Sequence, residues 1–387
     1  MLSEIAAKNF NENRLFFSED ELINQIQEFG AGNANTLETF NARKVLETIL
    51  IDQGLFVERV SRSYSFSHLT FQEYLTANYI VGHPQSIPGL VTEYLHNHQW
   101  REVFLLTSGL MHEADDLLVA MEVEAAKFID TPQLKTLFKW AEQLTDTTDD
   151  RYDGVTKRVF ALHQYFSLWM LNRIYEDEEV KTHVQYDLHF HRYLNINFHQ
   201  YLNINTRYLR RDFDLYMHIQ LMQYLNLNQH SRRYPDFTLY IDLYQYVPPY
   251  FYSLFSAASG DRFDEELQGR IRYVKHIEEM KIFKGVDLQR VVQRFSAQRK
   301  YIKAVREGKP IEPPAESIHD TWLSVLGITS EMLTISYEEL ESFSEYLHAV
   351  DLIVACKEAA GRVSRDKWQE IEDRFLTVDA ADIEAKR

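Results

Sequence analysis

The chain has 387 residues, 45% hydrophobic and 26% charged, with a formal net charge of −17. This apolar content supports two or three folded domains and excludes a disordered or fibrous protein. Residues 1–80, 81–150 and 311–387 carry net charges of −5, −8 and −10, whereas residues 151–310 carry +6. The basic middle suits a local contact with a polyanion or an acidic surface, without implying that the whole protein binds one.

Glycine and proline are scarce, at 13 and nine residues, so long helices are expected rather than turn-rich sheets. The single cysteine, Cys356, cannot form an internal disulfide, as is typical of a reducing compartment. No segment approaches the ~20 apolar residues of a membrane span, and the first residues lack the order of a signal peptide. We therefore expect a cytoplasmic protein without a membrane partner.

The first predicted helices lie within residues 1–83. Ser18 and Glu21 form a capping box that opens an amphipathic helix over residues 19–29. A further helix is predicted from about Thr36 to Gln53 and should end at Gly54, a residue that readily adopts a left-handed conformation.

A β-hairpin follows these helices. Two alternating runs, Leu55–Val60 and Tyr64–Leu69, are separated by three residues. Helices followed by a two-stranded wing predict a winged helix over residues 1–83. The next helix begins in the string FSHLTFQEYLTANYIV, where Thr70 and Glu73 form a second capping box and Leu69 and Tyr74 a hydrophobic staple.

Residues 84–150 are predicted to form a helical domain. One helix contains residues 98–111, another covers residues 113–129, and a third begins at Thr131 with Pro132 in its first turn. The acidic stretch Asp146–Asp150 is the expected boundary with the next domain.

Residues 151–309 are interpreted as a basic, tyrosine-rich helical sensor region. Apolar residues at helical spacing predict a long helix over Val155–Tyr175, and further helices are expected over 263–282 and 287–305. Between them the string YLNIN occurs at 193–197 and 201–205, and YLNLN at 224–228. A period of eight fits neither a solenoid unit nor a heptad, so a local duplication on helices is predicted.

Residues 310–387 are predicted to be an acidic C-terminal helical domain. The Pro310–Pro314 stretch interrupts the helices, and Ser336 and Glu339 cap the next helix. Trp368 and Phe375 mark a final helix. The fold class is therefore mainly α, a winged helix with a small β-hairpin followed by a multi-helix bundle or solenoid-like region, with strands below about a tenth of the residues.

Motifs for hydrolysis or metal binding are missing from the sequence. No GxxxxGK[ST], HExxH, GxSxG or CxxC string occurs, and Cys356, on an apolar helix, is expected to be an inert core thiol. His183, His189, His191 and His199 lack a nearby cysteine that would complete a zinc set, so an interaction surface is favoured over a metal site. We expect no metal and no enzymatic activity in this chain.

The string FSHLTFQEYLTANY resembles the end of the winged helix of NACHT-type STAND ATPases, the class that includes NOD-like receptors and bacterial defence proteins. LETILIDQGLFVER and SYSFSH upstream, and HQWREVFLLTSGLM downstream, resemble the surrounding segments of these proteins, so the likeness covers about residues 1–130. VSRDKWQEIEDRF, near the C-terminus, is similar to the ending of bacterial members.

This resemblance implies a role for His68. In the family, the histidine of the wing motif contacts the β-phosphate of ADP held by a neighbouring nucleotide domain and locks the closed state; Phe66, Thr70, Gln72 and Glu73 then support the motif. An imidazole N–H is suited to donate to a phosphate oxygen. The alternative is that His68 ends a strand and packs beneath the wing, with Gln72 and Glu73 serving the helix terminus.

A second candidate site is the basic stretch Arg270–Lys309, where 12 basic residues face four acidic ones. The site residues chosen within it are Arg270, Arg272, Lys275, Arg290, Arg294, Arg299 and Lys300. Such a surface would track phosphates or hold a partner. Pairing with the acidic C-terminal block of the same chain is the favoured interpretation.

We thus expect the regulatory and sensor portion of a NACHT-type STAND ATPase switch in bacterial antiphage signalling. Its expected partners are a nucleotide-binding NACHT domain in cis or in trans and a protein ligand or further copies of itself; ADP or ATP would be a cofactor of the parent assembly and not of this chain. A winged-helix nucleic-acid-binding regulator is the alternative, although a net charge of −5 over residues 1–80 disfavours it. An enzyme of another kind lacks a catalytic constellation.

Overall fold

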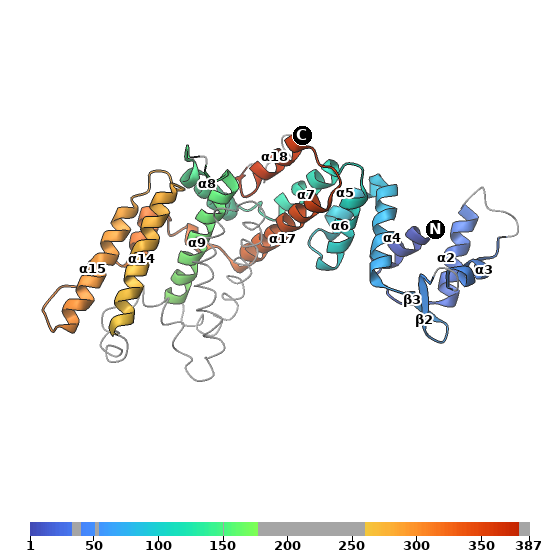
Figure 1. Ribbon diagram of the computed structural model, residues 1–387, viewed down its shortest axis with the longest axis horizontal. Helices are drawn as coiled ribbons and strands as arrows, with labels where there is room; N and C mark the ends of the chain where they lie inside the picture. Colours follow the sequence, from blue (N-terminus) through green and yellow to red (C-terminus); the bar gives the residue numbers. More distant parts are fainter. Residues whose placement is uncertain (33–39, 51–53, 150, 177–259, 379–387) are drawn as a thin grey trace. The chain divides into compact units, whose positions relative to one another are not determined.

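The computed structural model describes residues 1–32, 40–50, 54–149, 151–176 and 260–378 (Figure 1). These residues form fourteen α-helices and one small antiparallel sheet, which confirms the mainly α fold. The chain divides into two units, one within residues 1–127 and 348–371 and the other within 128–347 and 372–387. The YLNIN repeat and the histidines at 183–199 lie outside the described residues.

The first unit begins with the predicted winged helix. Its elements are α1 (Leu2–Asn11), β1 (Phe17–Ser18), α2 (Glu19–Gly32), α3 (Ala42–Thr48), β2 (Phe56–Val60), β3 (Ser63–Phe66) and α4 (Leu69–Gly82). The hairpin is joined by a third strand that the sequence did not indicate, because Phe17 pairs with Tyr64 and Ser18 with Ser63. The strand order is β1-β3-β2, all antiparallel.

The core of the winged helix is aromatic where the strands meet the helices. Phe17, Phe56 and Phe66 are at most 4% exposed, and their ring centroids lie 4.5–6.1 Å apart. Leu22 and Ile26 of α2 are fully buried in the same cluster. Each such side chain contributes roughly 1.5–3 kcal/mol by leaving water, so the cluster fixes the sheet against the helices.

The predicted start of α2 is confirmed. The Ser18 backbone N–H donates to a Glu21 carboxylate oxygen (2.7 Å), and the Glu21 N–H donates to the Ser18 hydroxyl (3.3 Å). The next helix is shorter than predicted, because α3 begins at Ala42, after the N-cap Asn41, and ends at Thr48 rather than at Gly54. Gly54 does have the left-handed conformation expected of it, with a φ of +59°.

The capping box predicted at Thr70 and Glu73 is wrong. The N-cap of α4 lies two residues earlier, at His68, whose backbone is extended (φ −135°, ψ 143°) and whose side chain makes no cap bond, so the helix begins at Leu69. Glu73 is only 8% exposed because it lies on the inward face of α4, so its carboxylate does not reach back to the cap. Leu69 lies inside the helix rather than before its cap, so the staple with Tyr74 does not arise.

The remainder of the first unit is helical. It contains η2 (Pro84–Ser86), α5 (Ile87–Tyr94), η3 (His98–Trp100), α6 (Arg101–Leu110), α7 (Asp115–Lys127) and parts of α17 (Tyr337–Ala359) and α18 (Arg365–Arg374). The Ser108 hydroxyl on α6 donates to the Cys356 carbonyl on α17 (2.7 Å). Burial raises the pKa of the Cys356 thiol, which gives this residue the character of an inert core side chain.

The second unit is built from long helices. These are α8 (Pro132–Thr145), α9 (Gly154–Glu176), α14 (Gly260–Met280), α15 (Leu288–Arg306), α16 (Ile318–Leu326), the short η5 (Met332–Thr334) and the beginning of α17. Helices α14 and α15 lie side by side in Figure 1, joined by a short turn. The predicted helix ends are confirmed at Thr131, whose hydroxyl caps α8 with Pro132 in the first turn, and at Ser336 and Glu339 before α17.

Candidate functional site

His68 occupies the junction between β3 and α4 in the first unit. Its side chain is exposed, and its ring centroid lies 5.9 Å from that of Phe71. Within the described residues the imidazole makes no hydrogen bond or ion pair. The ring therefore stands at the N-terminus of a fourteen-residue helix with both nitrogens available to a ligand.

The residues chosen around His68 divide into buried and exposed positions. Phe66 is buried in the aromatic core and fixes the end of β3, whereas Thr70 is exposed in the first turn of α4. Gln72 is 1% exposed and donates from Nε2 to the Arg14 carbonyl oxygen (3.2 Å). His68 is thus not packed beneath the wing, and Gln72 does not serve the helix terminus.

Glu73 is a packing residue rather than part of the exposed site. Burial raises the pKa of its carboxyl group, and the nearby Glu102 carboxylate raises this pKa further. Helix α4 packs against α6, which carries Glu102. Glu73 therefore acts on the position of α4 and has no direct route to a ligand at His68.

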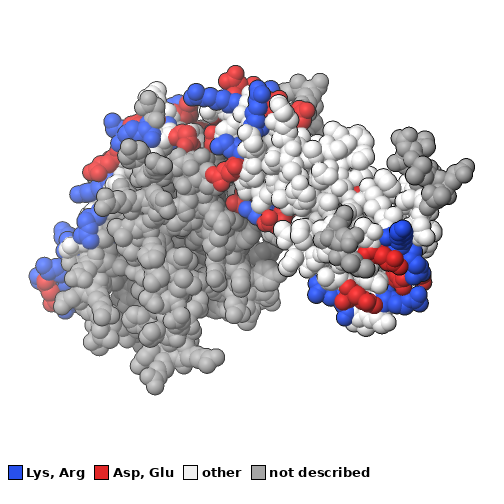
Figure 2. Space-filling model, turned by 45° about the vertical axis from the view of Figure 1, so that its right-hand side comes forward, with Lys and Arg blue, Asp and Glu red and all other residues white. Residues whose placement is uncertain are grey.

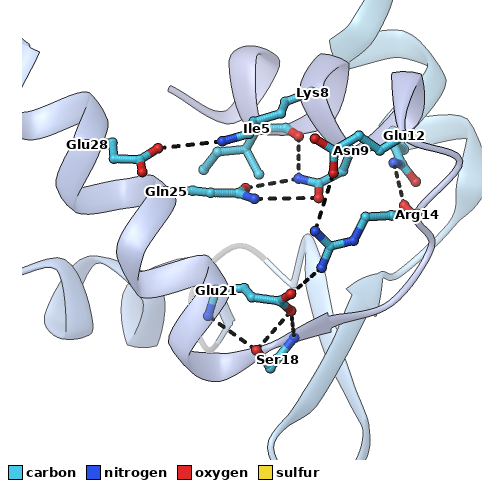
Figure 3. A network of polar contacts seen from close by, with 10 residues as sticks. Ile5, Lys8, Asn9, Glu12, Arg14, Ser18, Glu21, Gln25 and Glu28 are labelled. Atoms are coloured by element: carbon cyan, nitrogen blue, oxygen red, sulfur yellow. Dashed lines mark hydrogen bonds and ion pairs between the residues drawn. The ribbon is translucent and has the colours of Figure 1, made fainter.

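Arg14 links the His68 helix to the start of the winged helix (Figure 3). Its guanidinium forms ion pairs with Glu21 and Glu12, and Glu21 is the acid of the first capping box. Figure 3 also shows Asn9 donating to Gln25 (2.9 Å) between α1 and α2. The segment that receives the Gln72 hydrogen bond is therefore held by charged and polar contacts on both sides.

Arg59 is a site residue that the sequence analysis missed. The register shifts between Glu58 and Val60, so Arg59 is the extra residue of a β-bulge. Its guanidinium donates to the Ser65 hydroxyl (2.9 Å) and to the Ser67 carbonyl oxygen (3.3 Å). A cation is thus placed beside the residue that precedes His68, and only the bulge, which sequence alternation does not reveal, directs it there.

These groups share a preference for anions. The amides at the N-terminus of α4 carry a partial positive charge, the Arg59 guanidinium is a cation, and the His68 imidazole offers an N–H donor. Within the part of the chain that the structure describes, no group of three or more histidine, cysteine or acidic side chains is arranged to hold a metal ion. The groups of the His68 site are therefore suited to contact an anion.

Comparison with protein families gives two matches. Residues 11–80 match the winged helix-turn-helix domain C-terminal to NACHT, and residues 292–378 match the NACHT C-terminal helical domain 2. The chain carries a NACHT-associated C-terminal region. No curated protein and no solved structure matched the chain in the same comparisons.

The matched winged helix of this NACHT-associated region contains the whole His68 site, from Arg14 and Arg59 to Gln72. The second match covers most of α15, all of α16 and α17, and the last helix. Neither match covers a P-loop NTPase domain. No helix among the described residues is long and apolar enough to cross a membrane.

The basic residues of the NACHT-associated region do not form one continuous site. Arg270 is buried at 8% exposure, Arg299 is half-buried, and Arg272, Lys275 and Lys300 are exposed. Figure 2 shows mostly blue side chains along its left-hand margin, on the side where α15 lies in Figure 1, with red ones among them.

Two arginines of α15 are held by an acid from the C-terminal block. Arg290 forms an ion pair with the Glu316 carboxylate (2.8 Å), and the Arg294 guanidinium donates to the Glu316 backbone carbonyl. Arg294 also donates to Gln298 (2.9 Å). These contacts join the basic stretch to the acidic C-terminal block at Arg290 and Arg294.

Proposed function

We propose that this NACHT-associated region is the regulatory and sensor part of a STAND-type ATPase switch. The winged helix would contact a NACHT nucleotide-binding domain, and His68 would donate a hydrogen bond to the β-phosphate of the ADP held there. The observation that carries this proposal is the exposed imidazole of His68, without a partner in the described residues, at the N-terminus of α4.

The geometry around His68 favours a phosphate that is brought by another domain. Arg59 and the α4 amides supply positive potential at an exposed histidine, where a nucleotide would be held mainly by its own domain. The bond from His68 would then lock the closed arrangement. Exchange of ADP for ATP would follow once the two domains separate.

The helical part of the chain would supply the trigger. A ligand or partner that binds the helices better in the open arrangement shifts the equilibrium by the difference in its two affinities. The resemblance to bacterial defence proteins supports a cytoplasmic role in antiphage signalling. ADP and ATP belong to the parent assembly, and the chain by itself would hydrolyse neither.

The test compares His68→Ala with His112→Ala in a complex that contains the NACHT nucleotide domain. Both histidines are exposed in the first unit, but only His68 stands at the α4 N-terminus. His68→Ala should raise basal activation and speed ADP release, and His112→Ala should change neither. Unchanged ADP release in His68→Ala would disprove the lock.

A separate measurement tests the isolated chain. Calorimetry with ADP should detect no micromolar binding, and an ATPase assay should detect no turnover. Tight ADP binding by the chain alone would contradict the assignment of the nucleotide to another domain.

A further inference from the structure

The second unit contains a cleft between two interhelical loops, well separated in sequence from His68. One side is the loop between α8 and α9, with Asp146 to Asp149, and the other is the α14–α15 turn with Lys281 to Leu288. Its volume is about 470 Å³, within the range of small-molecule sites. The α14–α15 turn is joined to the last turn of α8 by a backbone hydrogen bond from the Lys284 N–H to the Leu144 carbonyl (2.7 Å).

The floor of the cleft is apolar. It is lined by Ile277 and Leu288, which are 1% and 4% exposed, and by the half-buried Phe283 and Val286. These side chains provide one aromatic and three aliphatic surfaces for the body of a ligand.

The acidic side chains of the cleft already have partners. Lys284 binds Asp146, and its hydrogen bond and charge lower the pKa of that carboxyl group. Arg151 binds Asp149 through Nε (2.9 Å) and lowers its pKa to about 2. The third acid, Glu278, accepts a hydrogen bond from the Gln289 amide.

Two cations, Lys281 in the lining of the cleft and Lys157 bonded to the lining loop, have no carboxylate bonded to them within the described residues. Lys157, 6% exposed, donates only to neutral oxygens: the hydroxyl and carbonyl of Thr147 (2.9 and 3.3 Å) and the carbonyl of Asp149. Lys281 lies exposed on the rim, where its charge acts on Asp149 without an ion pair. An anion in the cleft would therefore meet Lys281, a lining cation that no carboxylate of the described residues binds.

We propose that this cleft binds a small amphiphilic anion, a compound with an apolar body and one carboxylate, sulfonate or phosphate group. The body would cover Phe283 and Val286, and the anionic group would lie near Lys281. This site does not depend on the proposed nucleotide switch, because its lining residues all belong to the helical unit.

The test uses the full chain without nucleotide or nucleotide domain. The probe is 1-anilinonaphthalene-8-sulfonate, and N-phenyl-1-naphthylamine is the matched compound without the sulfonate. Binding is followed by fluorescence and calorimetry. We expect the sulfonate to bind at a saturable site more tightly than the neutral compound, with an affinity that falls as salt is added.

The variants locate the site. Lys281→Gln should weaken sulfonate binding about three- to fivefold, as expected for one exposed charge contact. Lys139→Gln removes the same charge from the exposed surface of α8, outside the cleft and outside the basic stretch, and should leave binding unchanged. Val286→Glu, which places an anion on the floor, should abolish this binding while circular dichroism confirms the fold.

Equal affinity of wild type, Lys281→Gln and Lys139→Gln for the sulfonate would overturn the proposal. So would equal binding of the two probes, because the cleft would then select apolar surface alone. If Val286→Glu unfolds, the comparison of the two lysine variants decides.

Discussion

The guanidinium of Arg59 donates a hydrogen bond to the carbonyl oxygen of Ser67 at 3.3 Å, one residue before His68. This contact joins the bulged edge strand β2 to the point where β3 passes into α4. A change in the wing at Arg59 would therefore alter the backbone next to His68, the candidate phosphate contact. Arg59 and His68 should act on the same anion.

The first prediction concerns Arg59→Ala in a complex with the nucleotide domain. ADP affinity should fall about two- to fivefold, the range for one exposed charge contact. Release of a fluorescent ADP analogue measures it. Arg62→Ala is the control, because Arg62 pairs with Glu19 and not with the Ser67 segment. Equal rates of ADP release from the two variants would show that Arg59 does not contribute to the site.

The sequence predicted the winged helix and the place of His68 at the end of the wing, before the next helix. Hairpin alternation and the FSHLTFQEYL string are local signals for both. The sequence did not predict β1, a strand of two residues whose partners lie 45 and 47 positions away. It also predicted a helix cap at Thr70, but the N-cap is His68 and the Glu73 side chain is buried. The Arg59 bulge depends on the exact pairing of β2 with β3, and the Glu316 contacts depend on how the segment before α16 packs against α15. Neither is visible in the local hydrophobic pattern of a single sequence.

The second prediction compares the two capping boxes that the sequence indicated in the winged helix. Ser18→Ala should destabilise α2 by about 1 kcal/mol, since the Ser18 hydroxyl accepts from the Glu21 N–H. Thr70→Ala should cost much less, because Thr70 is exposed and lies inside α4. Hydrogen exchange of the α2 and α4 amides measures both changes. A loss of stability in Thr70→Ala as large as in Ser18→Ala would contradict the finding that Thr70 does not cap α4.

The third prediction concerns His348, which is 7% exposed and whose ring centroid lies 3.9 Å from that of His98. Burial lowers the pKa of His348 to about 4, and the charges of His98, Arg101 and His96 lower it further. The unfolded chain then binds more protons than the folded chain between pH 6.5 and about 4. The stability contributed by this residue is therefore lost as the pH falls through that window.

Replacing His348 with leucine should reduce the loss of stability between pH 6.5 and 4. The slope of the unfolding free energy against pH is measured by denaturant unfolding at several pH values, with hydrogen exchange used to report on the first unit. His112→Leu is the control, because His112 is exposed. An unchanged slope in His348→Leu would assign the acid sensitivity to other groups.

The last prediction concerns nucleic acid, the partner that the basic stretch suggests as an alternative. Glu316 holds Arg290 through its carboxylate and Arg294 through its backbone carbonyl, so two of the site cations are occupied by the chain itself. The intact protein should therefore bind RNA and DNA weakly. Glu316→Gln removes the carboxylate charge and should unmask binding, because Arg290 is then available to phosphates.

Gel-shift titrations of wild type, Glu316→Gln and Glu312→Gln test this point. Glu312 is exposed four residues earlier, so its substitution makes the same change in net charge without releasing Arg290. Binding by Glu316→Gln should exceed that of the other two and should fall steeply between about 50 and 200 mM salt, as counterion release requires. Equal gains in the two variants would trace the effect to net charge alone. Tight, salt-sensitive binding by the wild type would instead favour the nucleic-acid-binding function, since the exposed cations at Arg272, Lys275 and Lys300 would then suffice without Arg290.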